Sequence, residues 1–397
     1  MSHSLSYYAW QRFKKNRPAF IGLIYIICCT LIAITGPSIL PDHSPNANEQ
    51  IIELETRKPG FQVSMLKVWK NKLNNSASLF DYFISGVDYN YNLRPYNSYF
   101  FKGDSIYLQA YGGTVKKANI ESYHLAEIVF PVSASTVILH TNNLISFSDI
   151  YGLKHVNTLP ELQSMVRNKF IINMYYWLGT DRYGRDMLSR VLLGTRISLS
   201  VGFIAVLISL VLGILLGSFA GFFGGWIDMA IQWVINVVWS IPTLLLVMAI
   251  SLILGRGFWQ VFIAVGLTMW VEVARIIRGQ ILSTRELDYV QAGRALGFKN
   301  IRLIFRHILP NIIGPVLVIA ASNFASAIVL ESGLSFLGIG VQAPAPSWGV
   351  MLNEHFSYIV MDAAYLALIP GIAIMLMVLA FNMLGNGLRD ALDVRLK

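Results

Sequence analysis

Charged residues and cysteines are both scarce in this chain. Only 13% of its 397 residues are charged and 55% are hydrophobic, whereas a soluble domain usually carries about a quarter charged residues. This composition excludes an ordinary soluble protein and predicts an integral membrane protein. The two cysteines, Cys28 and Cys29, are adjacent within one apolar run. They cannot form a disulfide framework, and no ligand spacing surrounds them.

Several patterns that carry chemistry are also missing. The sequence has no G-x-x-x-x-G-K-[ST] loop, no H-E-x-x-H and no G-x-S-x-G, so it gives no indication of ATP binding, zinc-protease or serine-hydrolase activity. Its seven histidines are scattered. We therefore predict no catalytic, cofactor-binding or metal-binding residues. Glu331 follows an apolar run, and a structural role near the outer interface is favoured over a proton relay.

The sequence contains several long apolar runs. About 20 apolar residues cross the hydrocarbon core of a membrane. The first run follows a basic start but has no small-residue cleavage pattern, which favours a retained helix over a signal peptide. The sequence therefore predicts an all-α polytopic membrane protein with six transmembrane helices, at residues 18–36, 197–223, 229–254, 257–275, 312–330 and 363–384.

Basic residues cluster beside two of these spans. RFKKNR at 12–17 has four basic residues and no acid, and 275–306 has seven basic residues against two acids. Positive charge next to a span marks the cytoplasmic side, so residues 1–17, the loop 276–311 and the C-terminus are expected in the cytoplasm of a cell (inner) membrane protein. Nucleic acid is not an expected partner, because the clusters adjoin apolar spans and lack base-stacking aromatics.

Residues 37–176 are polar, and we expect them to form an extracytoplasmic insert between the first two spans. Alternating runs such as DSIYLQAYGG and EIVFPVSASTVIL suggest short strands, and hence a mixed, partly β module. The following segment, 177–196, pairs Asp186 with Arg190 at i, i+4. It is either an amphipathic helix on the outer membrane surface or a plain turn before the span.

Small residues and one proline mark special positions in the next two spans. Pro242 frees a backbone carbonyl and predicts a kink that could form part of a pathway wall. Glycines at every fourth position lie on one helix face, where a neighbouring helix can approach closely. Helix packing is the favoured role for these glycines over a direct contact with substrate. They are Gly213, Gly217, Gly221 and Gly225.

The charged stretch ELDYVQAGRALGFKNIRLIFRHILPN, at 286–311, interrupts the apolar pattern. Acids open it, which suits the first turn of a helix, and Gly297 suits the left-handed residue that ends one. The pattern predicts a helix–turn–helix with Ala292 and Gly293 on its surface. It is either a helix that docks into a groove on another protein or a solvated interfacial loop.

This stretch resembles the cytoplasmic coupling loop of ATP-binding-cassette (ABC) importer permeases, which reads E-A-A, three residues, G, nine residues, I-x-L-P. Gln291 stands for the glutamate, Gly293 for the second alanine and His307 for the isoleucine. Residues 178–202 and 331–349 resemble segments of dipeptide, oligopeptide and nickel permeases. The resemblance implies that the ATPase-coupling residues are Asp288, Gln291, Ala292, Gly293, Arg294, Leu296 and Gly297.

The resemblance also implies a function. The chain would be a permease subunit that forms half of a pathway for di- or oligopeptides, coupled through 286–297 to two ATPase subunits. A second homologous permease and an extracytoplasmic solute-binding protein complete the expected complex. ATP and Mg²⁺ would bind the ATPase subunits, and no cofactor is expected on this chain, which is not itself an enzyme. The alternatives are import of nickel or another small solute, a secondary carrier or channel, and a membrane enzyme whose catalytic module is the insert.

Overall fold

The computed structural model describes residues 5–70, 78, 84–112, 120–132, 136, 138–141, 144–255 and 257–392. The chain forms two compact units. We call residues 1–34 and 194–397 the helical unit, and residues 35–193 the mixed unit.

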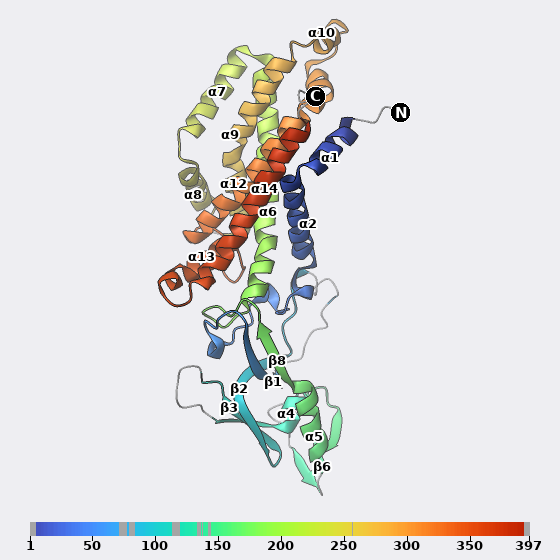
Figure 1. The fold of residues 1–397 in the computed structure, drawn as a ribbon, viewed down its shortest axis with the longest axis vertical. Coiled ribbons are helices and arrows are strands. Elements are labelled where there is room, and N and C mark those ends of the chain that lie inside the picture. Colours follow the sequence, from blue (N-terminus) through green and yellow to red (C-terminus); the bar gives the residue numbers. More distant parts are fainter. Residues whose placement is uncertain are drawn as a thin grey trace. The chain divides into compact units, whose positions relative to one another are not determined.

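The helical unit consists mainly of long apolar helices that run side by side (Figure 1). Helices suit a membrane because they satisfy their own backbone hydrogen bonds. Helix α6 begins within the mixed unit and continues through the helical unit. The helices are α1 (Leu5–Lys15), α2 (Arg17–Thr35), α6 (Met187–Phe223), α7 (Gly225–Trp239), α8 (Thr243–Leu254), α9 (Phe258–Thr284), α10 (Asp288–Ala295), α11 (Asn300–Arg302), α12 (Ile313–Phe336), α13 (Trp348–His355) and α14 (Tyr365–Leu392).

Five helical stretches in the described chain are long and apolar enough to cross a membrane. They contain α2, α6, α9, α12 and α14, and a bent pair of helices, α7 and α8, brings the number to six if the pair is one span. The protein is therefore a mostly helical, polytopic membrane protein. Helix α9 continues to Thr284, beyond the predicted end of its span at 275.

The predicted third span, 229–254, is not one straight helix. Helix α7 ends at Trp239, α8 begins at Thr243, and their axes differ by 93°. Pro242 lies in the break and precedes the first residue of α8. Proline has no N–H to donate, so the predicted kink at this residue is confirmed.

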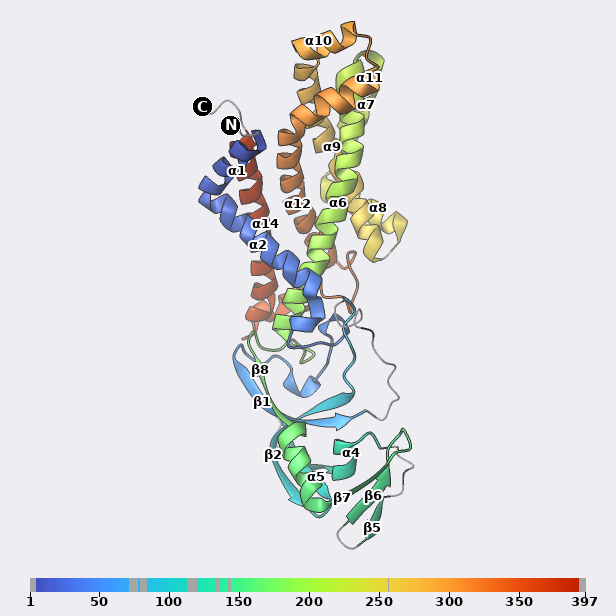
Figure 2. The same ribbon diagram turned by 90° about the vertical axis from the view of Figure 1, so that its right-hand side faces the viewer.

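Both ends of the described chain meet at one end of the helical unit (Figure 2). The Asn16 side chain donates a hydrogen bond to Asp390 Oδ2 at 3.1 Å. Phe13, Ala19 and Ala391 are buried together beside that bond. Helix α1 and the last turns of α14 therefore form one packed contact.

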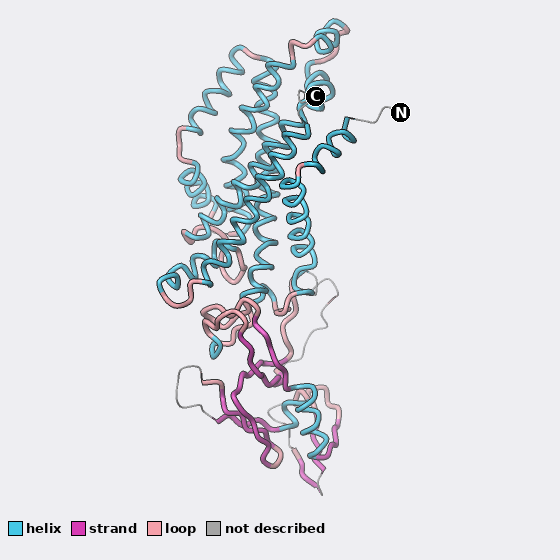
Figure 3. The backbone as a smooth tube through the Cα atoms, in the orientation of Figure 1, coloured by secondary structure: helices cyan, strands magenta, loops and turns pink. Residues whose placement is uncertain are grey.

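The mixed unit contains two antiparallel sheets (Figure 3). The larger has the order β4-β3-β2-β1-β8, and the smaller has the order β5-β6-β7. Two short helices, α4 and α5, contribute buried apolar residues to the same core as the strands. The elements are β1 (Phe61–Trp69), β2 (Tyr91–Lys102), β3 (Ser105–Ala110), β4 (Ile120–His124), α4 (Leu125–Val129), β5 (Leu139–Thr141), β6 (Leu144–Ser148), β7 (Lys154–Thr158), α5 (Leu159–Met165) and β8 (Ile171–Tyr176).

Alternation in the sequence identified the strands of this unit only in part. The run DSIYLQAYGG contains β3, where Ile106 and Leu108 are buried and Tyr107 between them is less so. The run EIVFPVSASTVIL begins instead with the last residues of α4. His124 caps α4 by accepting a hydrogen bond from the Ala126 N–H at 3.1 Å, and this local bond favours helix over strand.

The mixed unit also extends past its predicted end at 176, as far as Leu193. A buried polar network holds the added segment. Asp181 accepts a 2.6 Å hydrogen bond from Arg185 Nε, and Arg190 Nε lies 3.7 Å from the same carboxylate. Arg185 also donates to Asn48 Oδ1 at 3.1 Å. Because buried charges must be paired, residues 179–193 fold with this unit.

Of the two alternatives for 177–196, the structure therefore shows no separate surface helix in this described segment, and turns precede Met187 instead. Its second half is the start of the continuous helix α6, and Thr180 does not cap a helix but accepts a 2.9 Å hydrogen bond from the Arg57 N–H. Asp186 lies just before α6 in this buried region, where desolvation raises the pKa of its carboxyl.

Candidate functional site

The segment between α9 and α12 forms a compact hairpin at the end of the helical unit (Figure 2). Its first helix, α10, ends at Ala295 and is followed by the cap residue Leu296 and by Gly297, which has φ +74°. The Phe298 N–H bonds to the Gly293 carbonyl at 3.0 Å, and the Gly297 N–H bonds to the Arg294 carbonyl at 2.9 Å. This pair of bonds is the Schellman pattern that satisfies the last carbonyls of a helix. The predicted role of Gly297 is confirmed.

One face of α10 packs onto the chain that follows it. Val290 and Leu303 are fully buried. A Cβ atom on Gly293 would lie 2.7 Å from Leu303 Cδ2 and 3.3 Å from Phe298 Cδ2. Gly293 is thus buried inside the hairpin, where it lets the two arms approach. The prediction that Gly293 lies on the exposed face is wrong.

The rest of α10 and its two caps are exposed. Leu296, just after the helix, is 74% exposed, and Leu287, just before it, is 49% exposed. In the second arm of the hairpin, Ile301 is 63% exposed. We call the exposed surface of α10 and its caps the outer face of the hairpin. The other predicted coupling residues are also exposed, namely Asp288, Gln291, Ala292, Arg294 and Gly297.

The hairpin is attached to the helices of the bundle by charged contacts. Arg285 Nη1 donates to the Gly221 carbonyl at the end of α6, at 3.0 Å. The Arg294 guanidinium lies 5.1 Å from the centre of the Phe222 ring. Buried residues of the hairpin, including Ile304 and Ile308, join the same core as Ile277 of α9. A displacement of the hairpin would therefore be transmitted to α6 and α9.

Helices α6 and α9 approach each other closely along the glycine face. A Cβ atom on Gly213 would lie 2.4 Å from Val273 Cβ, one on Gly217 would lie 2.5 Å from the Ala274 carbonyl oxygen, and one on Gly221 would lie 2.9 Å from the Arg278 carbonyl oxygen. Only glycine permits this backbone approach. Gly225 differs, since it starts α7 and the space at its Cβ position is empty to 4 Å.

The other side of α9 borders a cavity of about 350 Å³. Residues from α7, α8, α9, α12 and α14 form its walls, and the break between α7 and α8 lies beside it. The lining is mostly apolar with a few polar groups, which is typical of a ligand site. These polar and aromatic side chains include Trp239, Thr243, Thr268, Glu272, Ser326 and Asn382.

Charged residues of α9 near the cavity mostly have partners. Arg278 makes two 2.6 Å hydrogen bonds to Asp228 of α7. The Arg275 guanidinium lies 3.7 Å from the ring centre of Trp239, within the range of a cation–π contact. These contacts position α7 against α9 on the hairpin side of the break.

Glu331 has the structural role that the sequence suggested. Its side chain is fully buried in α12, and Ser335 Oγ donates a 2.7 Å hydrogen bond to Glu331 Oε1. Ser335 Oγ in turn accepts the Val341 N–H at 3.1 Å. Glu331 therefore helps to fix the segment between α12 and α13.

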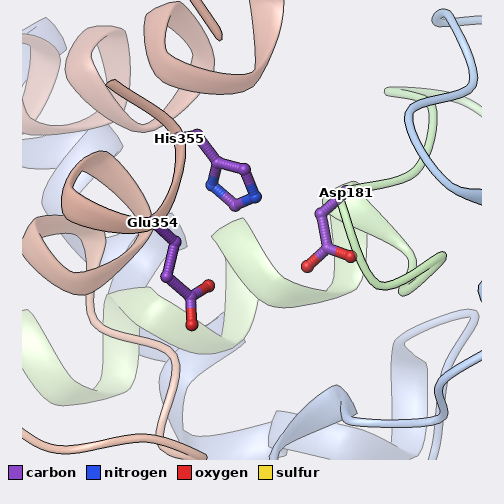
Figure 4. A group of neighbouring side chains, drawn as sticks. All are labelled: Asp181, Glu354 and His355. Carbon is purple, nitrogen blue, oxygen red and sulfur yellow. The ribbon is translucent and has the colours of Figure 1, made fainter. Parts of the chain in front are cut away.

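Figure 4 labels Asp181, Glu354 and His355, whose side chains offer oxygen and nitrogen atoms of the kind that bind metal ions. Glu354 and His355 end α13 of the helical unit, whereas Asp181 belongs to the mixed unit. Asp181 already accepts the hydrogen bond from Arg185, and His355 Nδ1 lies 2.7 Å from the Met351 carbonyl oxygen. We assign no metal site to these residues.

Comparison with known proteins gives consistent matches. Residues 213–397 match the model of the binding-protein-dependent transport system inner membrane component, and residues 4–59 match that of the N-terminal TM domain of oligopeptide transport permease C. The dipeptide transport system permease protein DppC of Alkalihalophilus pseudofirmus is 44% identical over 222 residues, which cover 56% of this chain and 73% of that protein.

Two further relatives have similar sequence identity and coverage. The glutathione transport system permease protein GsiD of Pectobacterium atrosepticum is 43% identical, with 56% of this chain and 73% of that protein covered. GsiD of Salmonella typhimurium is 44% identical, with 57% and 74% covered. A solved structure of the MetNI methionine ABC transporter has a TM-score of 0.44 and 16% identity, with 52% of this chain and 98% of that chain covered.

The fold and the relatives define a multi-pass membrane permease. The chain belongs to the family of binding-protein-dependent transport system inner membrane components, the permeases of ABC importers. The resemblance inferred from the hairpin sequence is thereby confirmed.

Proposed function

We propose that this chain is a permease subunit of an ATP-driven importer of di- or oligopeptides, and that it forms half of the translocation pathway. The relatives at 43–44% identity are named as dipeptide and glutathione permeases, and glutathione is itself a small peptide. The expected partners are a second homologous permease, two ATPase subunits and an extracytoplasmic solute-binding protein. ATP and Mg²⁺ bind the ATPase subunits, which supply the energy.

Six spans are proposed, with the bent pair α7–α8 counted as one. Asp228, near the start of α7, bonds to Arg278, near the end of α9, so these two ends lie at the same level. Arg285 joins the end of α9 to the end of α6. The chain therefore has to cross the bundle between Asp228 and Phe258, and only α7 and α8 are available to do so.

The orientation follows from charge. Six crossings return the chain to its starting side, which agrees with the contact between Asn16 and Asp390. Helix α1 carries Arg12, Lys14 and Lys15 in its last turn, and such clusters favour the cytoplasm. The hairpin and both termini are then cytoplasmic. The mixed unit, between the first and second spans, is extracytoplasmic.

The observation that carries the coupling proposal is the outer face of the hairpin. It presents apolar side chains to solvent, while the inner face is anchored to α6 and α9. A partner that binds the outer face could therefore shift both helices. An ATP-driven change in the ATPase pair would favour one of two arrangements of the bundle, since a partner shifts an equilibrium by its differential affinity.

The test is Leu296→Glu, which places a charge at the most exposed apolar side chain of the outer face. Burying an unpaired charge costs several kcal/mol, and about 1.4 kcal/mol already weakens binding tenfold. We expect the variant to fold and insert, to lose at least tenfold in affinity for the ATPase subunits, and to lose ATP-dependent uptake. Co-purification and uptake in proteoliposomes measure these effects.

Lys299→Glu is the matched control, because this exposed residue lies beyond the turn at Gly297. It should retain ATPase binding and uptake. Gly293→Glu would not discriminate, since it would disrupt the hairpin against Leu303. Full ATPase binding and uptake by Leu296→Glu would refute the docking surface.

A further inference from the structure

An acidic side chain lies near the middle of α9, within a candidate span. Glu272 is 14 residues after Phe258 in a helix of 27 residues, which places it about 21 Å along the helix axis. A charged side chain at this level is costly in lipid, and such residues normally face a cavity or another charged group. The position of Glu272 therefore requires an explanation other than exposure to lipid.

Glu272 faces the cavity described above. Its neighbours in the cavity wall come from central parts of other helices, including Ser326 of α12 and Asn382 of α14. The cavity thus lies at mid-level in the helical unit. Charged groups at mid-membrane commonly mark substrate or ion pathways.

Glu272 is also the acid near this cavity that is not engaged. Arg278 is bound by Asp228, and Arg275 lies over the Trp239 ring. Among the residues that the structure describes, none forms a hydrogen bond or an ion pair with Glu272. Its side chain is exposed to the cavity. A negative charge is therefore available to a positively charged solute.

We propose that Glu272 binds the positively charged amino group of the peptide as it passes through the pathway. This inference rests on the proposed import of peptides. Opposite charges a few ångströms apart attract more strongly at a protein surface than in bulk water. The hydroxyls of Thr243 and Thr268 and the amide of Asn382 line the same cavity, where they can accept or donate hydrogen bonds to peptide groups.

The test compares two peptides in proteoliposomes that hold the whole complex. Trialanine has a free ammonium group, and N-acetyl-trialanine does not. Each peptide is used at the same fractional saturation of the solute-binding protein. Because the permease variants leave that protein unchanged, the ratio of mutant to wild-type uptake isolates the contribution of Glu272.

Glu272→Gln removes the charge and keeps the shape, whereas Glu272→Asp keeps the charge. We expect Glu272→Gln to lower initial uptake of trialanine at least tenfold, Glu272→Asp to retain most of it, and the acetylated peptide to show a ratio near one for both. Glu354→Gln, on α13 and outside the cavity wall, is the control and should match the wild type. Co-purified ATPase subunits should be equal in all variants.

Equal losses for both peptides would overturn the proposal, and so would equal losses in Glu272→Gln and Glu272→Asp. If no variant transports the acetylated peptide, the comparison of Glu272→Gln with Glu272→Asp tests the proposal by itself. Loss of the ATPase or permease subunits from Glu272→Gln would show instead that Glu272 holds the complex together. Absence of ATP-dependent peptide uptake in the wild-type complex would refute the proposed function itself.

Discussion

The two sides of α9 are built in contrasting ways. Toward α6 its backbone is in near contact with Gly213, Gly217 and Gly221. Toward α7 and α8 it borders a broken span and a cavity. Close packing resists displacement because any shift requires atoms to overlap or separate. The α6 side therefore acts as a rigid contact, while the α7–α8 side has space for rearrangement.

Filling the glycine face should have the largest effect on stability. In Gly217→Ala the new Cβ would meet the Ala274 carbonyl oxygen at 2.5 Å, and overpacking of this kind costs about 1–3 kcal/mol. We expect a clear fall in the melting temperature of the purified protein in detergent. Gly279→Ala on α9 is the control, because nothing lies within 4 Å of its Cβ position. It should be neutral or gain up to about 1 kcal/mol; equal destabilisation by both variants would contradict the rigid contact.

Breaking the ion pair between α7 and α9 should have an intermediate effect. Asp228 and Arg278 have side chains that are 20% and 28% exposed, and they form two short hydrogen bonds. Asp228→Asn should destabilise the protein by about 1 kcal/mol, since one charge-assisted bond is lost in a partly solvated place. Glu286→Gln removes the partner of Arg285 where the acid is 61% exposed, and the same melting experiment should show almost no change. A larger loss of stability in Glu286→Gln than in Asp228→Asn would contradict this prediction.

Changing the cavity side should have the smallest effect on stability. The Trp239 side chain is 59% exposed, and its contact with Arg275 should contribute only about 0.5–1 kcal/mol. Trp239→Ala should therefore lower thermal stability less than Gly217→Ala does. If it destabilised the protein more than Gly217→Ala, the cavity side rather than the glycine face would be the rigid one.

Local sequence rules predicted the features that depend on neighbouring residues. Gly297 ends α10 with positive φ, and Pro242 lies in the break between α7 and α8, because each effect is set by the residue's own backbone. The apolar runs also indicated where candidate spans occur. The bend of 93° and the adjacent cavity were not predictable in this way, since they depend on packing among five helices.

The errors arose where distant residues decide the outcome. Helical spacing placed Gly293 on the surface, but Leu303 folds back over it after the turn at Gly297. Similarly, the i, i+4 spacing of Asp186 and Arg190 suggested a pair on a surface helix, whereas Arg190 approaches Asp181 inside the mixed unit. Glu272 lies within an apolar run of the sequence, but its relation to α12 and α14 is not contained in the local pattern.

In the mixed unit the first and last strands of the larger sheet pair with each other, and this pairing affects how the protein can evolve. Strand β1 pairs with β8, with Phe61 opposite Tyr176, and the Thr180 N–H bonds to the Arg57 carbonyl at 3.0 Å. The chain therefore leaves and returns at neighbouring points. A stretch with adjoining ends can be lengthened, shortened or exchanged in the gene while the flanking backbone stays where it is. The mixed unit can thus diversify independently of the helical unit.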